Sequence, residues 1–336
     1  MKSVSIKDIA SQVGVSTTTV SFVLNGKAKE KRISEDLKNE ILRIADKLHY
    51  RPNQVARGLR TGQTHTLGLI IEDISNPFFG NLAKVVEEEA DKHGYSVMFC
   101  STENNENRAS GLLTILKHRQ MDGFIITPTP GMEEDIQRLG EENRAVVLID
   151  RYFPGLDTTY VTVDNYKGAL EATNYLLGKG YKHIGLVTTD SEQVQMQNRY
   201  KGYADALEAK GLEVREENIL RLTFEMGHDE SVSRISGYIS SVKPEAIFFT
   251  TNYLGVFGLE GIRTCGLSLP ADLGMVCFDD HDLFRLGRPG VSVVAQPIEA
   301  IARQAVILLL DQLKNKGVDM EQVKLMLEPS LIKRDT

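Results

Sequence analysis

Apolar residues near the N-terminus recur every three or four positions, and this spacing predicts a helix. The first stripe consists of Ile6, Ile9, Ala10 and Val13. Ser5 and Asp8 stand where a capping box would close the start of that helix. Gly14 follows and permits a tight turn, because glycine adopts positive φ without strain. We therefore expect a short helix that ends at this turn.

A second short helix is predicted after Ser16, whose side chain can cap its N-terminus. We expect Val20 and Leu24 to be buried and Asn25-Gly26 to end the helix. The exposed side would carry Thr17, Thr18, Ser21 and Phe22. Two short helices around a tight turn form a helix-turn-helix, whose second helix enters the DNA major groove through its N-terminal residues. The alternative is that these threonines are only the polar start of an ordinary helix.

A third helix favours the DNA-binding interpretation. Between Ser34 and Tyr50 the apolar residues recur at spacings of four, three and four, and they are Leu37, Ile41, Ile44 and Leu48. One apolar stripe of this kind packs against the first two helices. The result is a three-helix headpiece over residues 5–50.

The next segment has a helical pattern with little stability of its own. Pro52 can begin a helix, and one side of that helix would carry Val55, Ala56 and Leu59. Gly58 weakens the helix, and the segment is too short to persist alone. A solvated linker is the alternative for residues 50–66. We place a hinge helix at 53–60 and a linker at 61–66.

The remainder alternates short apolar runs with amphipathic stretches, which is typical of parallel α/β sheets. One series of runs lies near 67–71, 96–100, 123–127 and 145–149, and a second lies near 183–187, 219–222, 246–249 and 275–278. The chain has 336 residues, so the part after the headpiece is long enough for two lobes of ordinary size. Open sheets of this class bind ligands at the carboxyl ends of their strands.

The balance of basic and acidic residues also changes near residue 60, at the end of the predicted headpiece and hinge. Residues 1–60 contain 12 Lys and Arg against 6 Asp and Glu, whereas the remainder contains 27 against 40. The overall net charge of −7 conceals this asymmetry. A small basic module on an acidic body indicates a nucleic-acid-binding head attached to a domain with another task.

Several motifs in this order resemble the LacI/GalR family of bacterial transcription regulators. They are Ile6-Lys7-Asp8-Ile9-Ala10, Gly14-Val15-Ser16, Thr19-Val20-Ser21, Val23-Leu24-Asn25, Leu48-His49-Tyr50-Arg51-Pro52-Asn53 and Val55-Ala56-Arg57-Gly58-Leu59. The resemblance implies an N-terminal three-helix helix-turn-helix headpiece plus hinge helix over 1–60. A two-lobe, periplasmic-binding-protein-like (type I) α/β domain with parallel sheets would follow over 67–336. Three crossovers would join its lobes, with lobe 1 at about 67–162 and 296–322 and lobe 2 at about 163–295 and 323–336.

The resemblance also assigns residues to DNA. The hinge helix would fold only on the operator, where Leu59 becomes an apolar wedge in the minor groove. Phe22 stands where many members have Arg or His, so it can contact a thymine methyl group but cannot donate a hydrogen bond. The candidate DNA-binding residues are Ser16, Thr17, Thr18, Thr19, Ser21, Phe22, Asn25, Tyr50, Asn53, Val55, Ala56, Arg57, Leu59 and Arg60.

Residues at strand ends are candidates for an effector site between the lobes. By resemblance they are Asp73, Asn76, Phe78, Phe79, Asp150, Arg151, Arg199, Phe224, Asn252, Asp279 and Gln296. Carboxylate, amide and guanidinium groups beside an aromatic face are suited to the hydroxyl groups and ring of a sugar. A purine or a sugar acid also fits this inventory. For any one Asp or Asn, a helix cap or turn is the alternative role.

These observations predict a ligand-responsive, sequence-specific transcriptional regulator. We expect a cytoplasmic homodimer that represses carbohydrate-metabolism genes, recognises a pseudo-palindromic operator in double-stranded DNA and binds a sugar or sugar derivative. A regulator that responds to a purine or another metabolite is the alternative. A sugar-binding transport protein and a cytosolic α/β enzyme are less favoured, because we find neither a signal peptide, a membrane span nor a catalytic motif. Cys100, Cys265 and Cys277 lack metal-ligand spacing, so we expect no metal or cofactor.

Overall fold

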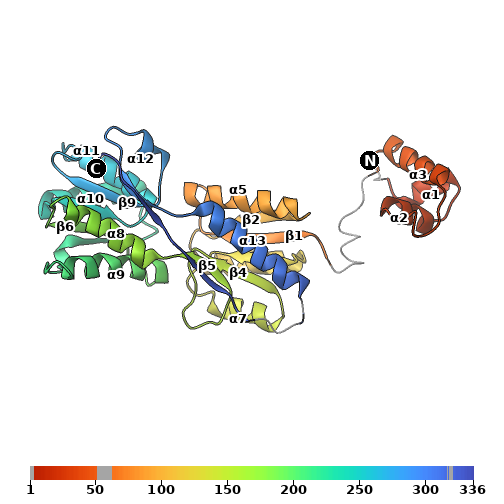
Figure 1. Cartoon of the computed structure of the whole chain (residues 1–336), viewed down its shortest axis with the longest axis horizontal. Helices are drawn as coiled ribbons and strands as arrows, with labels where there is room; N and C mark the ends of the chain where they lie inside the picture. Colours follow the sequence, from red (N-terminus) through yellow and green to blue (C-terminus); the bar gives the residue numbers. More distant parts are fainter. Residues whose placement is uncertain (1–3, 51–62, 316, 318–320) are drawn as a thin grey trace. The chain divides into compact units, whose positions relative to one another are not determined.

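A computed structural model describes residues 4–50, 63–315, 317 and 321–336. The chain divides into two compact units, Met1–Thr64 and His65–Thr336 (Figure 1). The first unit contains the three predicted helices, which are α1 (Ile6–Val13), α2 (Thr17–Leu24) and α3 (Glu35–Lys47). The predicted hinge at 53–60 lies outside the described residues, as does the start of the predicted linker.

The helix ends of the headpiece follow the predicted capping. The backbone N–H of Ser5 donates to Oδ2 of Asp8 at 2.8 Å, and Gly14 ends α1 with a φ of 76°. One apolar core joins the three helices and consists of Ile9, Ala10, Val20, Val23, Ala28, Ile41, Ile44 and Ala45. Our expectation for α2 was wrong in one detail, because Val23 is buried and Leu24 is only half-buried. Leu24 is the last residue of α2, where fewer neighbours cover a side chain.

The first lobe of the second unit is a six-stranded parallel sheet in the order β11-β5-β4-β3-β1-β2. Its strands are β1 (Thr66–Ile71), β2 (Ser96–Ser101), β3 (Gly123–Ile126), β4 (Ala145–Ile149), β5 (Tyr160–Val163) and β11 (Lys324–Leu327). Helices α5 (Pro77–Lys92) and α13 (Ile298–Lys314) share one hydrophobic core with the sheet, and α6 (Glu106–His118) and α7 (Glu133–Glu141) share the other. The sheet is therefore covered by helices on both faces, as a parallel sheet requires.

The second lobe repeats this plan in the order β12-β10-β9-β8-β6-β7. Its strands are β6 (Ile184–Thr189), β7 (Ile219–Leu222), β8 (Ala246–Phe249), β9 (Gly274–Phe278), β10 (Ser292–Ala295) and the antiparallel β12 (Ser330–Ile332). Its main helices are α8 (Asn165–Gly178) and α9 (Val194–Glu208) on one face, and α10 (His228–Val242), α11 (Asn252–Thr264) and α12 (Asp282–Leu286) on the other. In both lobes the second strand along the chain lies at one edge, and the order reverses between the first and third strands, β1 and β3 in the first lobe and β6 and β8 in the second. Ligands bind at such switch points.

Three crossovers connect the lobes, but the last lies later than predicted. We assigned residues 323–336 to the second lobe, whereas β11 pairs in parallel with β5 of the first sheet, Lys324 opposite Tyr160 and Leu327 opposite Val163. The chain crosses after β11, and only β12 joins the second sheet. No side chain of β11 is fully buried, so its sequence lacks the apolar run that marks a central strand.

None of the helices in the described ranges is both long enough and apolar enough to span a bilayer.

Candidate functional site

The first turn of α2 is open to solvent. The hydroxyl of Ser16 accepts a hydrogen bond from the backbone N–H of Thr19 at 3.1 Å, which fixes the start of the helix. Thr17 and Thr18 follow this cap, and both side chains are exposed. Val20 and Val23 are buried on the packing face of the helix, so neither threonine is needed for the headpiece core.

Other predicted DNA-binding residues of the headpiece have structural partners. The hydroxyl of Thr19 lies 2.9 Å from that of Ser16, and Nδ2 of Asn25 donates to the carbonyl oxygen of Ser21 at 2.7 Å. Tyr50 packs against the headpiece core, and this burial raises the pKa of its hydroxyl. These side chains therefore stabilise the ends of α2 and the segment after α3.

The ammonium group of Lys31 lies over the ring of Phe22. Nζ of Lys31 lies 5.4 Å from the centre of the Phe22 ring, within the range of a cation–π interaction. Phe22 itself is half-buried. The position that lacks a hydrogen-bond donor in its own side chain therefore has an ammonium group beside it.

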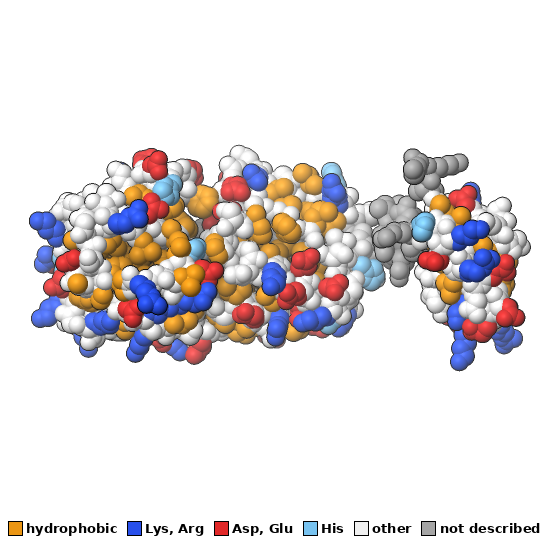
Figure 2. Space-filling view, turned by 90° about the horizontal axis from the view of Figure 1, so that it is seen from above, with side chains coloured by type: hydrophobic (Ala, Val, Ile, Leu, Met, Phe, Trp, Pro, Cys, Tyr) orange, Lys and Arg blue, Asp and Glu red, His pale blue; other side chains and the backbone are white. Residues whose placement is uncertain are grey.

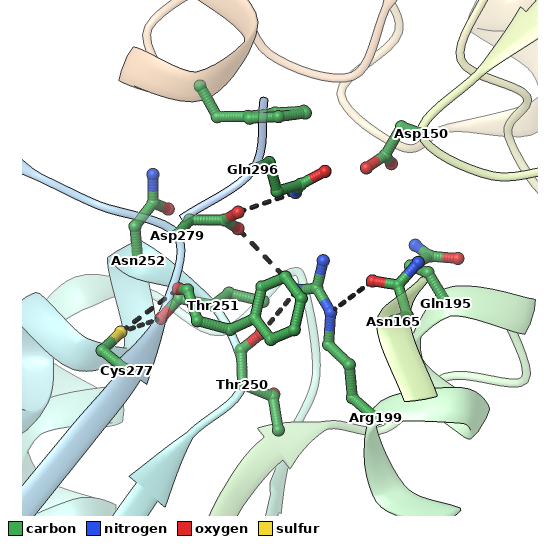
Figure 3. Close-up of polar contacts among 12 residues, drawn as sticks. Asp150, Asn165, Gln195, Arg199, Thr250, Thr251, Asn252, Cys277, Asp279 and Gln296 are labelled. Carbon is green, nitrogen blue, oxygen red and sulfur yellow. Dashed lines mark hydrogen bonds and ion pairs between the residues drawn. The ribbon is translucent and has the colours of Figure 1, made fainter. Parts of the chain in front are cut away.

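In the second unit a cavity of about 450 Å³ opens between the lobes. Three acidic or amide residues at strand ends line it, namely Asp150 after β4, Asn252 after β8 and Asp279 after β9 (Figure 3). These strands are parallel within each sheet, so their carboxyl ends meet the same cleft.

Arg199 is a buried basic group of the cleft. Its side chain is 3% exposed. Nε donates to Oδ1 of Asn165 at 2.8 Å and Nη1 donates to the carbonyl oxygen of Thr250 at 2.6 Å. The guanidinium carbon lies 3.6 Å from the centre of the Phe278 ring, and Nη1 lies 3.7 Å from Oδ2 of Asp279. In Figure 3 the second terminal nitrogen of Arg199 points toward the space between Asp279 and Asp150.

Arg151 is fully occupied by the protein. Nε donates to the carbonyl oxygen of Pro128 at 2.7 Å, Nη1 donates to Oε1 of Gln193 at 3.0 Å, and Nη2 lies 2.8 Å from Oε2 of Glu72. Because each of its three nitrogens has a protein acceptor, Arg151 shapes the wall of the cleft more than it offers donors to a ligand.

Asp150 and Asp279 occupy equivalent positions in the two lobes. Each directly follows a five-residue buried strand, and their φ angles are 67° and 70°, in the left-handed region. Burial raises the pKa of Asp150 to about 6, an effect that Arg151 and Arg199 oppose. Burial also raises the pKa of Asp279, opposed by Arg199 and by a 2.7 Å hydrogen bond from Gln296. The cleft thus holds two carboxyl groups whose charged forms are disfavoured by burial.

Hydrogen bonds cross the cleft on both sides. Nδ2 of Asn252 in the second lobe donates to Oδ1 of Asn76 in the first at 2.8 Å. Nε2 of Gln193 donates to Oδ1 of Asn104 at 3.0 Å, while Oε1 of Gln193 accepts from Arg151. These contacts hold the two lobes in one defined relative position.

Comparisons with known proteins agree with this arrangement. The family model for bacterial regulatory proteins of the lacI family matches residues 5–53, and that for a periplasmic binding protein-like domain matches residues 173–336. The HTH-type transcriptional regulator DegA of Bacillus subtilis is 30% identical over 336 residues, which cover 98% of this chain and 96% of that protein. The chain belongs to the LacI family.

This LacI-family chain is also similar to a second sequence relative and to a solved structure. The ribose operon repressor of Haemophilus influenzae is 29% identical over 333 residues, covering 98% of each chain. The crystal structure of the lac repressor dimer bound to operator and the anti-inducer ONPF has a TM-score of 0.86 and 20% identity, covering 100% of this chain and 99% of that one. The predicted class is thereby confirmed: the chain is a DNA-binding transcriptional regulator with a ligand-binding α/β domain.

The structure brings nine of the eleven predicted effector residues to the cleft of this regulator. They are Asn76, Phe78, Phe79, Asp150, Arg151, Arg199, Phe224, Asn252 and Asp279. Asp73 does not line the cleft, because its carboxylate accepts hydrogen bonds from the backbone N–H and hydroxyl of Ser75. Gln296 reaches the cleft only through its hydrogen bond to Asp279.

Other cleft residues were not predicted. Glu72 stands one position before Asp73, and it is the side chain that pairs with Arg151. Gln193 is the residue before α9, Gln195 lies in the first turn of that helix, and Asn104 comes from the turn after β2. These residues follow predicted strands, as the predicted site residues do. The same rule, applied after every strand, would have included them among the candidates. Among the residues that the structure describes, no group of three or more His, Cys, Asp or Glu could hold a metal ion.

Proposed function

We propose that this protein is a ligand-responsive repressor of carbohydrate-metabolism genes that acts as a homodimer. Two α2 helices would enter adjacent major grooves of a pseudo-palindromic operator, and a sugar or sugar derivative would bind between the lobes. The protein would act through binding alone, without catalysis.

The exposed first turn of α2 carries the DNA-binding part of this proposal. Thr17 and Thr18 follow the Ser16 cap on a helix whose other face is buried in the headpiece core. A hydroxyl group can donate to or accept from a base edge, and the threonine methyl group fits the methyl group of thymine. Asn53, Val55, Ala56, Arg57, Leu59 and Arg60 lie outside the described residues, so their contacts with DNA are proposals from the sequence.

The polar cleft supports the ligand-responsive part. The polar groups that line it include the carboxyl groups of Asp150 and Asp279, the guanidinium group of Arg199 and the amide of Asn252. Aromatic rings from Phe79 and Phe224 also line it. This combination suits a hydroxylated ring, and the similarity to a ribose operon repressor agrees with it. A purine, which would use the same aromatic rings, is the alternative that a ligand screen distinguishes.

Exposed apolar side chains on the second unit support association. Phe99 is 55% exposed, Leu286 is 67% exposed and Ile307 is 46% exposed. Figure 2 shows apolar side chains between charged ones on one face of both lobes. Burying such surface against a second copy would stabilise a two-fold dimer, which would also place two headpieces on one operator.

Effector binding would act on the hinge. A change in the relative position of the lobes would alter the spacing of the two hinge segments, and a coupling of about 1–3 kcal/mol between the two sites is usual for such systems. Leu59→Ala is therefore expected to weaken operator affinity and reduce DNA bending. Unchanged affinity and bending in this variant would exclude the hinge assignment.

The decisive experiment selects operators from random double-stranded DNA with the full-length protein and measures affinity by fluorescence anisotropy. We expect a pseudo-palindromic site, and we expect Thr17→Ala to lose about 1–3 kcal/mol of affinity for it, with little change on unrelated DNA. Thr264→Ala is the matched control, because Thr264 is an exposed threonine of α11 in the second unit. If selection yields no preferred sequence, or if both variants bind like the wild type, the proposed function is wrong.

A further inference from the structure

The lining of the cleft is strongly acidic. Among the described residues, seven acidic side chains and two arginines line it, and no lysine or histidine does. Both arginines already have anionic partners, since Arg151 pairs with Glu72 at 2.8 Å and Arg199 lies 3.7 Å from Asp279. An anionic group would therefore enter a space whose positive charge is already compensated.

Most of the guanidinium donors in the cleft are already used by the protein. All three nitrogens of Arg151 donate to protein atoms, as do Nε and Nη1 of Arg199. Of the six guanidinium nitrogens of these two arginines, only Nη2 of Arg199 has no acceptor among the described residues. It points toward the open space (Figure 3). A ligand made only of acceptors, such as a phosphate or carboxylate, would find one free guanidinium nitrogen.

Two buried acceptor groups of the cleft, by contrast, are unused. Asp150 is 6% exposed, and neither of its carboxylate oxygens receives a hydrogen bond from any residue that the structure describes. Its nearest basic atom is Nη1 of Arg151, at 3.9 Å. Gln195 is 4% exposed, and its Oε1 has no hydrogen-bond partner among the described residues. Both side chains line the cleft, so a ligand that enters it meets buried acceptors without donors.

We propose that the effector is an amino sugar whose protonated amine binds at the Asp150 carboxylate. This inference rests on the proposed function, because it names the class of ligand for that same cleft. An ammonium group supplies three donors and a positive charge, which is what Asp150 and Gln195 lack. The hydroxyl groups of the sugar would use Asp279 and Nη2 of Arg199, and Phe79 and Phe224 would cover an apolar face of the ring.

The raised pKa of Asp150 agrees with this assignment. Burial is the main cause of the rise to about 6, and the two arginines offset it only in part. Glu72 and Asp279 add to the rise, because each is a second negative charge near Asp150. A bound cation would compensate this charge, whereas a bound anion would increase the mismatch.

The test is a ligand panel measured on the full-length protein at pH 7.5 by thermal shift and calorimetry. The probes are glucosamine, galactosamine and mannosamine, each with its parent hexose, its N-acetyl form and its 6-phosphate. We expect one amine to raise the Tm and to bind about tenfold or more tightly than its three matched forms, the ratio typical of a charge-assisted hydrogen bond.

Two variants locate the amine. Asp150→Asn keeps the shape of the side chain and removes its charge, so it should reduce the amine affinity about tenfold or more and remove the preference over the parent hexose. Asp91→Asn is the matched control, because Asp91 is exposed on α5. Circular dichroism of each variant establishes that it is folded.

Three results would overturn the inference: no amine binds, a parent hexose or phosphate binds as tightly as its amine, or Asp150→Asn keeps the preference. A hexose or phosphate that binds and alters operator affinity would overturn the amine and leave the proposed function standing. Failure of the operator selection would instead remove the proposed function, whatever the panel shows.

Discussion

Replacing Asp150 by Asn should stabilise the protein without ligand, and the gain should depend on pH. Asp150 lies near Arg151, Arg199, Glu72 and Asp279, and burial outweighs the two arginines in setting its pKa. Its pKa rises from 3.8 to about 6 on folding. Because the folded pKa is the higher one, the charged form is the one that folding disfavours. The stability that Asp150 contributes is complete below pH 4 and is lost as the pH rises through 6.

The size of the effect follows from the shift. A change of about two pKa units corresponds to about 3 kcal/mol at a pH well above both values. Asparagine has no charge to bury, so it does not carry this cost. The free energy of unfolding of Asp150→Asn should therefore equal that of the wild type near pH 3.5 and exceed it by up to about 3 kcal/mol at pH 8.

Urea unfolding at several pH values measures this difference. The chain contains no Trp and 11 Tyr, so circular dichroism at 222 nm is the better probe of the transition. Asp279 also has a raised pKa, and because its charge contributes to the rise at Asp150, the coupling between the two carboxyl groups is part of the measured difference. A difference that stays constant with pH, or that falls as the pH rises, would refute the reasoning.

Three further predictions concern packing and charge. Ile41→Ala should cost about 2–5 kcal/mol and abolish operator binding with ligand binding unchanged, whereas Leu42→Ala, 41% exposed on the same helix, should leave both intact in parallel binding assays. Gly202→Ala should lower the Tm of the second unit, because its Cβ would lie 2.4 Å from the carbonyl oxygen of Tyr166; Gly178→Ala has open space and should not lower it. Lys31→Gln should reduce the slope of log affinity for DNA against log salt by about 1 if Lys31 meets a phosphate beside Phe22, and an unchanged slope would exclude that contact.

The local parts of the structure could be predicted because local rules govern them. Ser5, Gly14 and Ser16 mark the headpiece helices by capping and turn chemistry, which a sequence displays directly. The central strands of both sheets are continuous apolar runs because helices cover both of their faces. Edge strands such as β11 are short and half-exposed, so only their pairing identifies them.

The cleft could be predicted only in part. A polar residue after a strand signals the carboxyl end of a sheet, and that rule found Asp150, Asn252 and Asp279. It could not decide between Glu72 and Asp73, because the local backbone determines which of two adjacent side chains faces the ligand. Gln193 was missed because its partners come from the other lobe, 89 residues away in the case of Asn104.

The three crossovers give this domain its mechanical character. The chain passes between the lobes after β5, between β10 and α13, and between β11 and β12, so neither lobe is a continuous stretch of polypeptide. Three tethers leave far fewer relative motions than one would, and they favour rotation about a common axis over sliding or separation. They also couple the unfolding of the two cores, because detachment of β11 and β12 removes a strand from each sheet. A destabilising substitution in one lobe should therefore also lower the stability of the other lobe, even when no side-chain contact connects the two.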